Sequence, residues 1–209
     1  MISYSSSMRS LVFFFTLLSL VLIAQCCFAE DSTAWYDKGV ELLNQSKYPD
    51  AAAAFRNATE LDPNNTWAWL NLGKAMQGMN WFTPSYDAFK NATTTDANNT
   101  WAWIFRGNFL QERNQIPQAI TMYQNAIKSD QKNAWAWYHL GTAEQALAHY
   151  PEAEQAFSDA IALDPTNQWA WYNLAVVQKS TGDYGGYAMN LRKASEIDPD
   201  LPHKVGLVS

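Results

Sequence analysis

The sequence predicts an all-α fold, a solenoid built from five helix–turn–helix repeats. Three observations predict it. Several residue types recur every 34 positions, each 34-residue block has the pattern of two amphipathic helices, and Pro or Asp-Pro signals separate the helices. Repeats of this length are typical of proteins in which each unit packs only on its neighbours. We therefore expect an elongated molecule with little or no β-strand.

Residues 1–29 are predicted to be a secretory signal peptide. A polar start is followed by a continuous apolar run over residues 11–24, and Cys27 and Ala29 then occupy the −3 and −1 positions before Glu30. This is the three-part layout of a cleavable signal. The alternative is an uncleaved membrane anchor through residues 11–29, which is short for a spanning helix. We favour cleavage, so the protein is expected to be secreted or extracytoplasmic.

Composition excludes several classes of function. The chain contains 10 Trp, 10 Tyr and 10 Phe, an aromatic content that excludes intrinsic disorder. Its net charge of −6 offers no basic excess for nucleic-acid binding. The only two cysteines, Cys26 and Cys27, lie in the predicted signal. The mature chain therefore has no thiol nucleophile, cysteine-based zinc site or iron–sulfur cluster.

The period of 34 appears in several independent series. One tryptophan series comprises Trp35, Trp69, Trp103, Trp137 and Trp171, and a second comprises Trp67, Trp101, Trp135 and Trp169. Glycine recurs at Gly39, Gly73, Gly107 and Gly141, and a large side chain at Phe55, Phe89, Tyr123, Phe157 and Leu191. These series define five repeats over residues 32–200, in blocks 32–65, 66–99, 100–133, 134–167 and 168–201, followed by a short tail, 202–209.

Each block is predicted to form two helices. In the fourth block, residues 134–147 have the spacing of one apolar helical face. Pro151 suits the first turn of a second helix, and the Asp-Pro pair in residues 164–167 ends it. Thr66 and Thr100 are expected to cap the first helices of the second and third blocks with their hydroxyls.

The recurring glycine predicts a close contact between the two helices of a block. Glycine inside a helix costs about 1 kcal/mol relative to alanine, so a close approach of the second helix is expected to offset it. The small residues Ala51, Ala119 and Ala153 are the expected partners of the glycines, with large aromatic side chains beside them.

These residues resemble the tetratricopeptide repeat family, whose pattern is W-x2-L-G-x2-Y, then A-x3-F, then P. The fourth block carries Trp137-x2-Leu140-Gly141, Ala153-x3-Phe157 and Pro165. The third and fifth blocks depart from the pattern at Arg106, Gln131, Ala175 and Tyr187. The resemblance implies a right-handed superhelix whose first helices line a concave groove. It also implies a role in binding peptide segments of other proteins.

No catalytic constellation is recognisable. His139, His149 and His203 fall on a first helix, in a turn and in the tail, and no metalloprotease, nucleophile-elbow or phosphate-loop motif occurs. We therefore expect no catalytic residues, no metal site and no cofactor.

The resemblance places a set of candidate ligand-binding residues in the groove. They are Trp67, Trp101, Trp135, Trp169, Tyr36, Tyr138, Tyr172, Phe105, His139, Lys74 and Asn108. Chaperone-binding members of the family clamp a carboxylate with Lys, Asn and Arg at set positions. Lys74 is the only cation at the groove positions of this chain, so a chaperone adaptor is not expected.

The two tryptophan series must face different surroundings. Trp67 and Trp69 are two residues apart on a helix and point about 200° apart. If Trp69 is buried, Trp67 lies toward the groove. The series of Trp67 is then either a stacking platform for a Pro-rich or aromatic peptide or a glycan chain, or a seal between successive blocks. Because tryptophan is seldom left exposed, the sequence favours the seal.

Five Asn-x-Ser/Thr sequons suggest glycosylation of an exported protein. They are Asn44, Asn57, Asn64, Asn91 and Asn98, all in the first two blocks. The alternative is that these residues are turn and cap residues copied by duplication.

The ends of the solenoid suggest a second class of function. Pro202 and Gly206 prevent the tail from forming a good helix, which leaves Ala188, Leu191 and Ile197 poorly covered. A head-to-tail contact between copies would not close and would propagate into a fibre or array. We favour a monomeric, exported, non-catalytic scaffold for protein–protein interaction, with self-assembly and glycan binding as alternatives.

Overall fold

A computed structural model describes residues 31–206 of the protein. The predicted signal peptide, Leu207 and Val208 lie outside the described residues. Within residues 31–206 every regular element is a helix, which confirms the all-α prediction. The helices are α2 (Ser32–Asn44), α3 (Tyr48–Leu61), α4 (Thr66–Gly78), α5 (Phe82–Thr95), α6 (Thr100–Glu112), α7 (Ile116–Ser129), α8 (Ala134–Ala146), α9 (Tyr150–Leu163), α10 (Gln168–Thr181), α11 (Tyr184–Ile197) and α12 (Leu201–Lys204).

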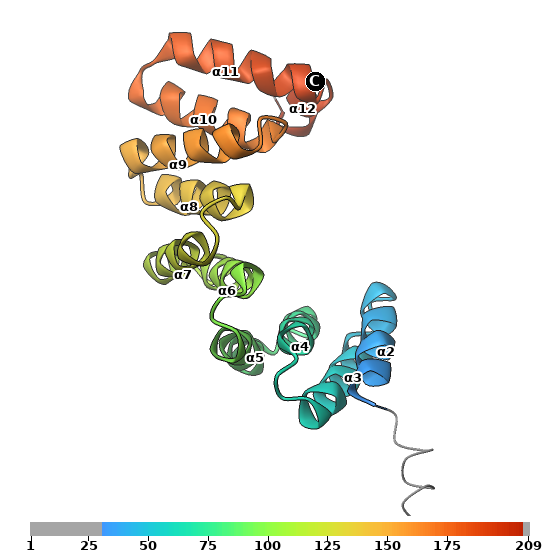
Figure 1. Ribbon diagram of the computed structural model, residues 1–209. Helices are drawn as coiled ribbons and strands as arrows, with labels where there is room; N and C mark the ends of the chain where they lie inside the picture. The colour runs from blue at the N-terminus through green and yellow to red at the C-terminus, as the bar shows by residue number, and fades with distance from the viewer. Residues whose placement is uncertain (1–30, 207–209) are drawn as a thin grey trace, which may run out of the picture.

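The helices form consecutive pairs stacked along a curved path (Figure 1). In each pair a first helix (α2, α4, α6, α8 or α10) packs on the second helix that follows it, and each second helix packs on the next first helix. Successive first helices also contact one another, whereas successive second helices of residues 31–206 do not. The first helices therefore line the inner, concave side. None of the helices between residues 31 and 206 has the length and apolar character that crossing a membrane requires.

Asparagine, rather than threonine, caps the first helices of the second to fifth pairs. The caps are Asn65, Asn99, Asn133 and Asn167, and each side-chain oxygen accepts the backbone N–H of the residue three positions on. The prediction that Thr66 and Thr100 cap these helices is therefore wrong. Both lie inside the first turn and are buried, and the hydroxyl of Thr100 pairs with that of Ser129 at 2.9 Å.

Each recurring glycine lies directly against an aromatic ring of the second helix. A Cβ atom placed on the glycine would lie 2.6 Å from Phe55 at Gly39, 2.7 Å from Phe89 at Gly73, 2.5 Å from Tyr123 at Gly107 and 2.7 Å from Phe157 at Gly141. The expected partners Ala51, Ala119 and Ala153 are fully buried nearby. The ring, however, fills the place of the missing side chain, and this contact offsets the helical cost of glycine.

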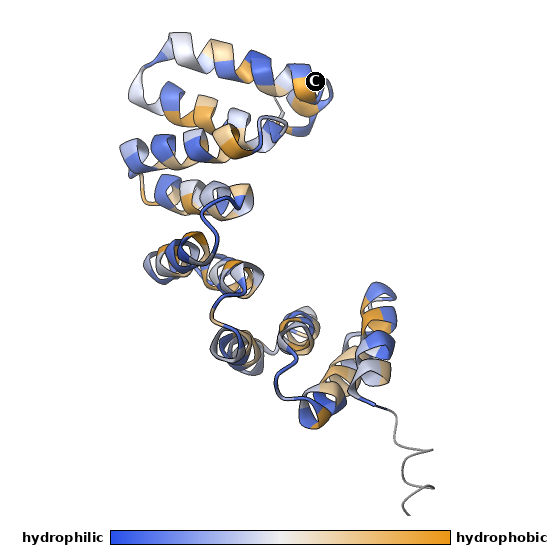
Figure 2. Cartoon of the chain, viewed as in Figure 1, coloured by the Kyte–Doolittle hydropathy of each residue, from blue (hydrophilic) through white to orange (hydrophobic). Residues whose placement is uncertain are grey.

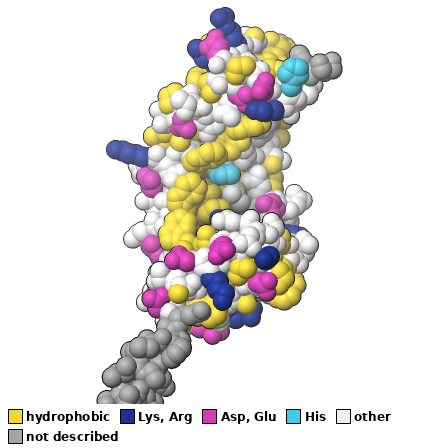
Figure 3. Space-filling model, turned by 90° about the vertical axis from the view of Figure 1, so that its right-hand side faces the viewer, with side chains coloured by type: hydrophobic (Ala, Val, Ile, Leu, Met, Phe, Trp, Pro, Cys, Tyr) yellow, Lys and Arg dark blue, Asp and Glu magenta, His cyan; other side chains and the backbone are white. Residues whose placement is uncertain are grey.

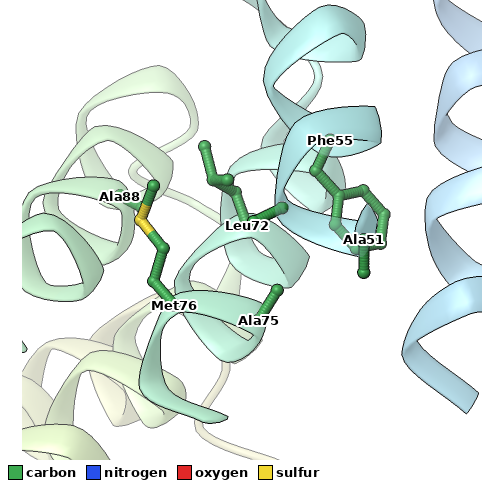
Figure 4. Close-up of a cluster of buried hydrophobic side chains, with 7 residues drawn as sticks. Ala51, Phe55, Leu72, Ala75, Met76 and Ala88 are labelled. Atoms are coloured by element: carbon green, nitrogen blue, oxygen red, sulfur yellow. The ribbon is translucent and has the colours of Figure 1, made fainter. Parts of the chain in front are cut away.

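The hydrophobic core is distributed along the solenoid instead of being gathered in one centre. Hydrophobic residues recur in every helix pair (Figure 2). Figure 4 shows one cluster, in which Met76 of α4 lies beside Ala88 of α5 and Leu72 of α4 lies between Met76 and Phe55 of α3. Each such cluster joins one pair to the next, so the curvature of the concave side is fixed by local packing.

The N-terminal end of the solenoid presents a polar face. Asp37, Lys38 and Glu41 of α2 are exposed, although the residues 34 positions later, Asn71, Leu72 and Ala75, are buried. Charged residues of α2 thus occupy the positions at which the first helix of a later pair packs on the pair before it. A polar outer face of this kind is what a terminal repeat needs for solubility.

The C-terminal end is partly covered by the tail. As expected from Pro202 and Gly206, the tail forms only a single helical turn, α12. Leu201 of α12 is fully buried, and Lys204 Nζ lies 2.7 Å from Asp198 Oδ2. Ala188 and Ile197 remain exposed on α11.

Candidate functional site

The series of Trp69 seals the junctions between successive helix pairs. Each of these indole N–H groups donates to a backbone carbonyl six residues earlier, in the turn that precedes its helix. The distances are 2.9 Å from Trp69 to Pro63, 2.8 Å from Trp103 to Ala97, 3.0 Å from Trp137 to Gln131 and 3.0 Å from Trp171 to Pro165. The sealing role that the sequence favoured for the series of Trp67 therefore belongs to these residues, which we call the sealing row.

The series of Trp67 lies on the concave side, and we call it the groove row. Trp67, Trp101 and Trp135 are 44%, 37% and 43% exposed, and Trp169 is half-buried. Their indole N–H groups donate to no acceptor among residues 31–206. Figure 3, which faces the concave side, shows hydrophobic side chains in a band along the molecule. The groove row thus keeps both an open ring face and a free donor.

Neighbouring aromatic side chains hold three of the four tryptophans of the groove row in place. Trp101 lies 6.2 Å from Phe105, Trp135 packs edge-on against Tyr138 at 5.8 Å, and Trp169 packs edge-on against Tyr172 at 6.4 Å. These separations are those of favourable aromatic pairs. The row is therefore supported from its own helices.

Tyrosine–asparagine hydrogen bonds link alternate first helices to their neighbours. Asn71 Nδ2 donates to the hydroxyl of Tyr36 at 3.2 Å, and Asn173 Nδ2 donates to that of Tyr138 at 3.3 Å. The candidate residues Tyr36 and Tyr138 thus fix the floor of the groove and retain only part of their surface for a ligand.

A polar pocket of about 430 Å³ opens in the middle of the groove, beside the groove row. Asn108, Gln111 and Glu112 of α6 and His139 of α8 line it. Below it, the fully buried Tyr123 reaches across from α7, and its hydroxyl lies 2.7 Å from Asn108 Oδ1 and 2.8 Å from Gln111 Oε1. The pocket offers amide groups to a ligand, whereas the Glu112 carboxylate already accepts a hydrogen bond from Gln77 Nε2 of α4.

His139 is neutral at physiological pH. Its ring stacks on Tyr123 at 5.5 Å and lies 6.1 Å from Trp135. Burial lowers the pKa of His139 to about 4. Burial, followed by the charge of Glu112, raises the pKa of Tyr123, so this hydroxyl also stays neutral.

Lys74 is a cation without an anionic partner in the groove. Its Nζ lies 3.9 Å above the ring of Phe105, and burial lowers the pKa of the amine. The ion pairs within residues 31–206 do not include Lys74. The side chain is therefore available to an anionic group of a ligand.

All of the candidate groove residues lie on first helices, and the structure brings several of them together. Phe105, Lys74, Asn108 and His139 surround the middle of the groove, whereas Tyr36 and Tyr172 lie toward its two ends. Sequence reasoning missed Gln111 and Glu112 of the pocket and the buried Tyr123 below it. The sequence signal that could have revealed this contact is Tyr123 itself, because it adds a hydroxyl at the position where three other repeats have Phe55, Phe89 and Phe157.

The described residues offer little for chemistry. No group of three or more His, Asp or Glu side chains in residues 31–206 could hold a metal ion. His149 Nδ1 lies 2.8 Å from Glu144 Oε2 at the start of α9, and neither residue lines the pocket beside His139 together with Asn108. The arrangement in the groove is suited to binding.

The fold and groove define a helical-repeat protein with an aromatic concave face. Family comparison identifies the repeat. A model described as TPR repeat matches residues 34–80 and 107–147, and two models described as tetratricopeptide repeat match residues 134–167 and 156–186. These matches together span more than half of the chain, so the protein contains tetratricopeptide repeats, as the sequence pattern predicted.

Solved structures share the fold. The crystal structure of MamA is 21% identical, with a TM-score of 0.69 over 79% of this chain and 96% of MamA. YrrB, described as a TPR protein with an unusual peptide-binding site, is 22% identical, with a TM-score of 0.66 over 86% of this chain and 92% of YrrB. PilF of Pseudomonas aeruginosa is 17% identical, with a TM-score of 0.72 over 79% of this chain and 76% of PilF. No curated protein sequence matches the chain.

Proposed function

We propose that the protein is an exported, non-catalytic scaffold that binds an extended polypeptide segment of a partner protein in its concave groove. The observation that carries this proposal is the groove row. Three of its four rings are exposed and its N–H groups have no acceptor within residues 31–206, while the sealing row two residues away provides the structural contacts. Exposed, well-supported aromatic side chains with free donors are typical of binding surfaces.

The rest of the groove supports a polypeptide ligand. A peptide backbone offers N–H and C=O groups, and the pocket offers the complementary amides of Asn108 and Gln111. YrrB, which shares the fold, is described as having a peptide-binding site. A glycan chain would also stack on tryptophan and remains the alternative ligand class. Self-assembly into a fibre is less favoured, because Asp37, Lys38 and Glu41 make the N-terminal end polar.

Export is part of the proposal and is supported by the apolar run over residues 11–24. N-terminal sequencing of the mature protein should find Glu30 as the first residue. A mature protein that retains residues 1–29 would instead favour the membrane anchor.

Glycosylation at the sequons would be compatible with an open groove. Asn44, Asn64 and Asn98 are exposed at helix ends or turns, and Asn57 and Asn91 are half-buried on the second helices. Intact-mass measurement before and after enzymatic removal of N-glycans tests whether they are modified. An unchanged mass would indicate that these asparagines are not glycosylated and are turn and helix residues copied by duplication.

Selection from a random peptide display library tests the function. Enriched peptides should bind the wild-type protein and the Trp81→Ala variant, and should bind Trp135→Ala at least about tenfold more weakly. Trp81 is the matched control because it is 52% exposed but lies in the turn before α5, off the groove row.

Two results would contradict the proposal. One is the absence of enriched peptides together with oligosaccharide binding that Trp135→Ala abolishes, which would favour the glycan alternative. The other is light scattering that shows concentration-dependent growth of the protein into fibres without a ligand.

A further inference from the structure

The groove row has a spacing that restricts the shape of its ligand. Its four tryptophans come from successive first helices, α4, α6, α8 and α10, which contact one another. The axes of packed helices lie about 8–10 Å apart. A ligand that meets each tryptophan in turn must therefore present an equivalent group about every 8–10 Å.

Of the common backbone conformations, polyproline II has a repeat that falls within this range. In a β-strand, side chains on one face recur at about 6.8 Å or, after four residues, at about 13 Å. An α-helix repeats at about 5.4 Å per turn and reaches about 10.8 Å after two turns. A polyproline II helix places every third residue on the same face, about 9.3 Å apart. The spacing of the row matches polyproline II.

The free indole donors favour the same conformation. Trp67, Trp101 and Trp135 each have an exposed ring and an N–H group that donates to nothing within residues 31–206. An α-helical ligand uses its own carbonyls internally, whereas a polyproline II segment has no internal hydrogen bonds and leaves its carbonyls free. A tryptophan can stack on a proline ring and donate to a neighbouring carbonyl at the same time.

Charge adds a second requirement on the ligand. Lys74 lies over Phe105, close to the middle of the groove, and no carboxylate within residues 31–206 pairs with it. A partly buried amine of this kind is stabilised by a carboxylate on the ligand. Because Phe105 also contacts Trp101, the carboxylate would lie beside the groove row.

We propose, resting on the peptide-binding function above, that the groove binds a proline-rich segment in the polyproline II conformation, with an acidic side chain opposite Lys74. Four tryptophans at this spacing span about ten residues of such a segment. The partner is thus a proline-rich stretch of a protein that carries one Asp or Glu and is otherwise uncharged.

The test uses labelled synthetic peptides of about twelve residues and fluorescence anisotropy with the purified protein. The first peptide consists of Pro-Pro-Ala triplets with one central alanine replaced by Glu. The second carries Lys in place of the Glu. The third has the composition of the first with its prolines gathered at one end, and the fourth replaces every proline by Ser or Thr.

The first peptide should bind best. Replacing its Glu by Lys should weaken binding about fivefold, and Lys74→Met should remove that difference. Trp135→Ala should weaken binding of the first peptide at least about tenfold, whereas Trp81→Ala should leave it unchanged. The fourth peptide should bind at least about tenfold more weakly than the first, because it lacks the proline rings that hold the polyproline II conformation, whereas the third, whose run of prolines also adopts that conformation, should bind nearly as well as the first.

Failure of this inference is distinguishable from failure of the proposed function. If the fourth peptide binds as tightly as the first and Trp135→Ala weakens both, the groove binds peptides but the polyproline II assignment is wrong. If the Glu and Lys peptides bind equally, the acidic requirement is wrong. If no peptide binds, including those selected by display, both proposals are wrong.

Discussion

Tryptophans two residues apart in the same helices have opposite surroundings. The sealing row is half-buried, and each of its indole N–H groups is bound to the preceding turn. The groove row is more exposed and has no partner for its N–H groups within residues 31–206. Helix geometry separates the two, since a step of two residues turns a side chain by about 200°. We therefore assign stability to the sealing row and the proposed ligand binding to the groove row, so that each property should change without the other.

The largest expected effect is on the sealing row. Trp137→Ala removes a packed ring and the hydrogen bond to the Gln131 carbonyl. The free energy of unfolding should fall by about 2–4 kcal/mol, somewhat less than for a fully buried tryptophan. Urea unfolding followed by far-ultraviolet circular dichroism measures it, with Trp81→Ala as the exposed control. A loss below about 0.5 kcal/mol would show that the row does not seal the junctions.

Acid should weaken the support beneath the groove row. The folded-state pKa of His139 is lowered to about 4, below its unfolded value of about 6.5. Below pH 6.5 the unfolded chain binds a proton that the folded chain does not. The stability from neutral His139 is thus complete above pH 6.5 and falls as the pH decreases toward 4, with a slope approaching about 1.4 kcal/mol per unit.

The matched variant for this prediction is His139→Asn, because asparagine occupies the same position at Asn71 and Asn173. The neighbouring hydroxyls of Tyr123 and Tyr138 have raised pKa values and do not titrate in this range. Urea unfolding of both proteins between pH 7 and pH 4 gives the comparison. Parallel pH profiles for wild type and variant would assign the acid sensitivity to other groups.

A smaller effect is expected from the hydroxyl below the pocket. Tyr123→Phe keeps the ring that packs on Gly107 but removes the contacts with Asn108 and Gln111. Phenylalanine already stands at this position in other repeats, so packing should be preserved. The expected loss is about 0.5–1.5 kcal/mol in the free energy of unfolding. A variant as stable as the wild type would mean that water replaces the hydroxyl without cost.

The sequence predicted the repeat architecture because the signals were redundant. Glycine, aromatic and turn-aspartate positions all recur with one period, so an error at one position could not change the fold. The caps were misassigned because Asn65 and Thr66 are both good capping residues, and propensity alone does not choose between neighbours. A comparison of the repeats distinguishes the two residues. Asparagine persists at Asn133 and Asn167, whereas the threonine gives way to Ala134 and Gln168.

The candidate site was less accessible to sequence reasoning. Helix periodicity placed the two tryptophan rows on different faces but could not decide which one contacts the preceding turn. That choice depends on how far each indole reaches in three dimensions. The pocket of Asn108, Gln111 and His139 was only partly foreseen, because Tyr123, which contacts Asn108 and Gln111 from below, belongs to a second helix. A contact of this kind follows from packing between helices, not from the pattern along one helix.

The smallest effect on stability is expected for Trp135→Ala, and it is the sharpest test of the comparison. This ring is 43% exposed, its N–H has no partner within residues 31–206, and its contacts are with Tyr138 and His139. Removing it should cost less than about 1 kcal/mol, the value of aromatic contacts of this kind. The same urea experiment that measures Trp137→Ala gives the value. If the two variants lose similar stability, the rows share one structural role and the groove loses its main support as a binding site. If Trp135→Ala stays near wild-type stability while peptide binding is lost, the exposed row is retained for a ligand.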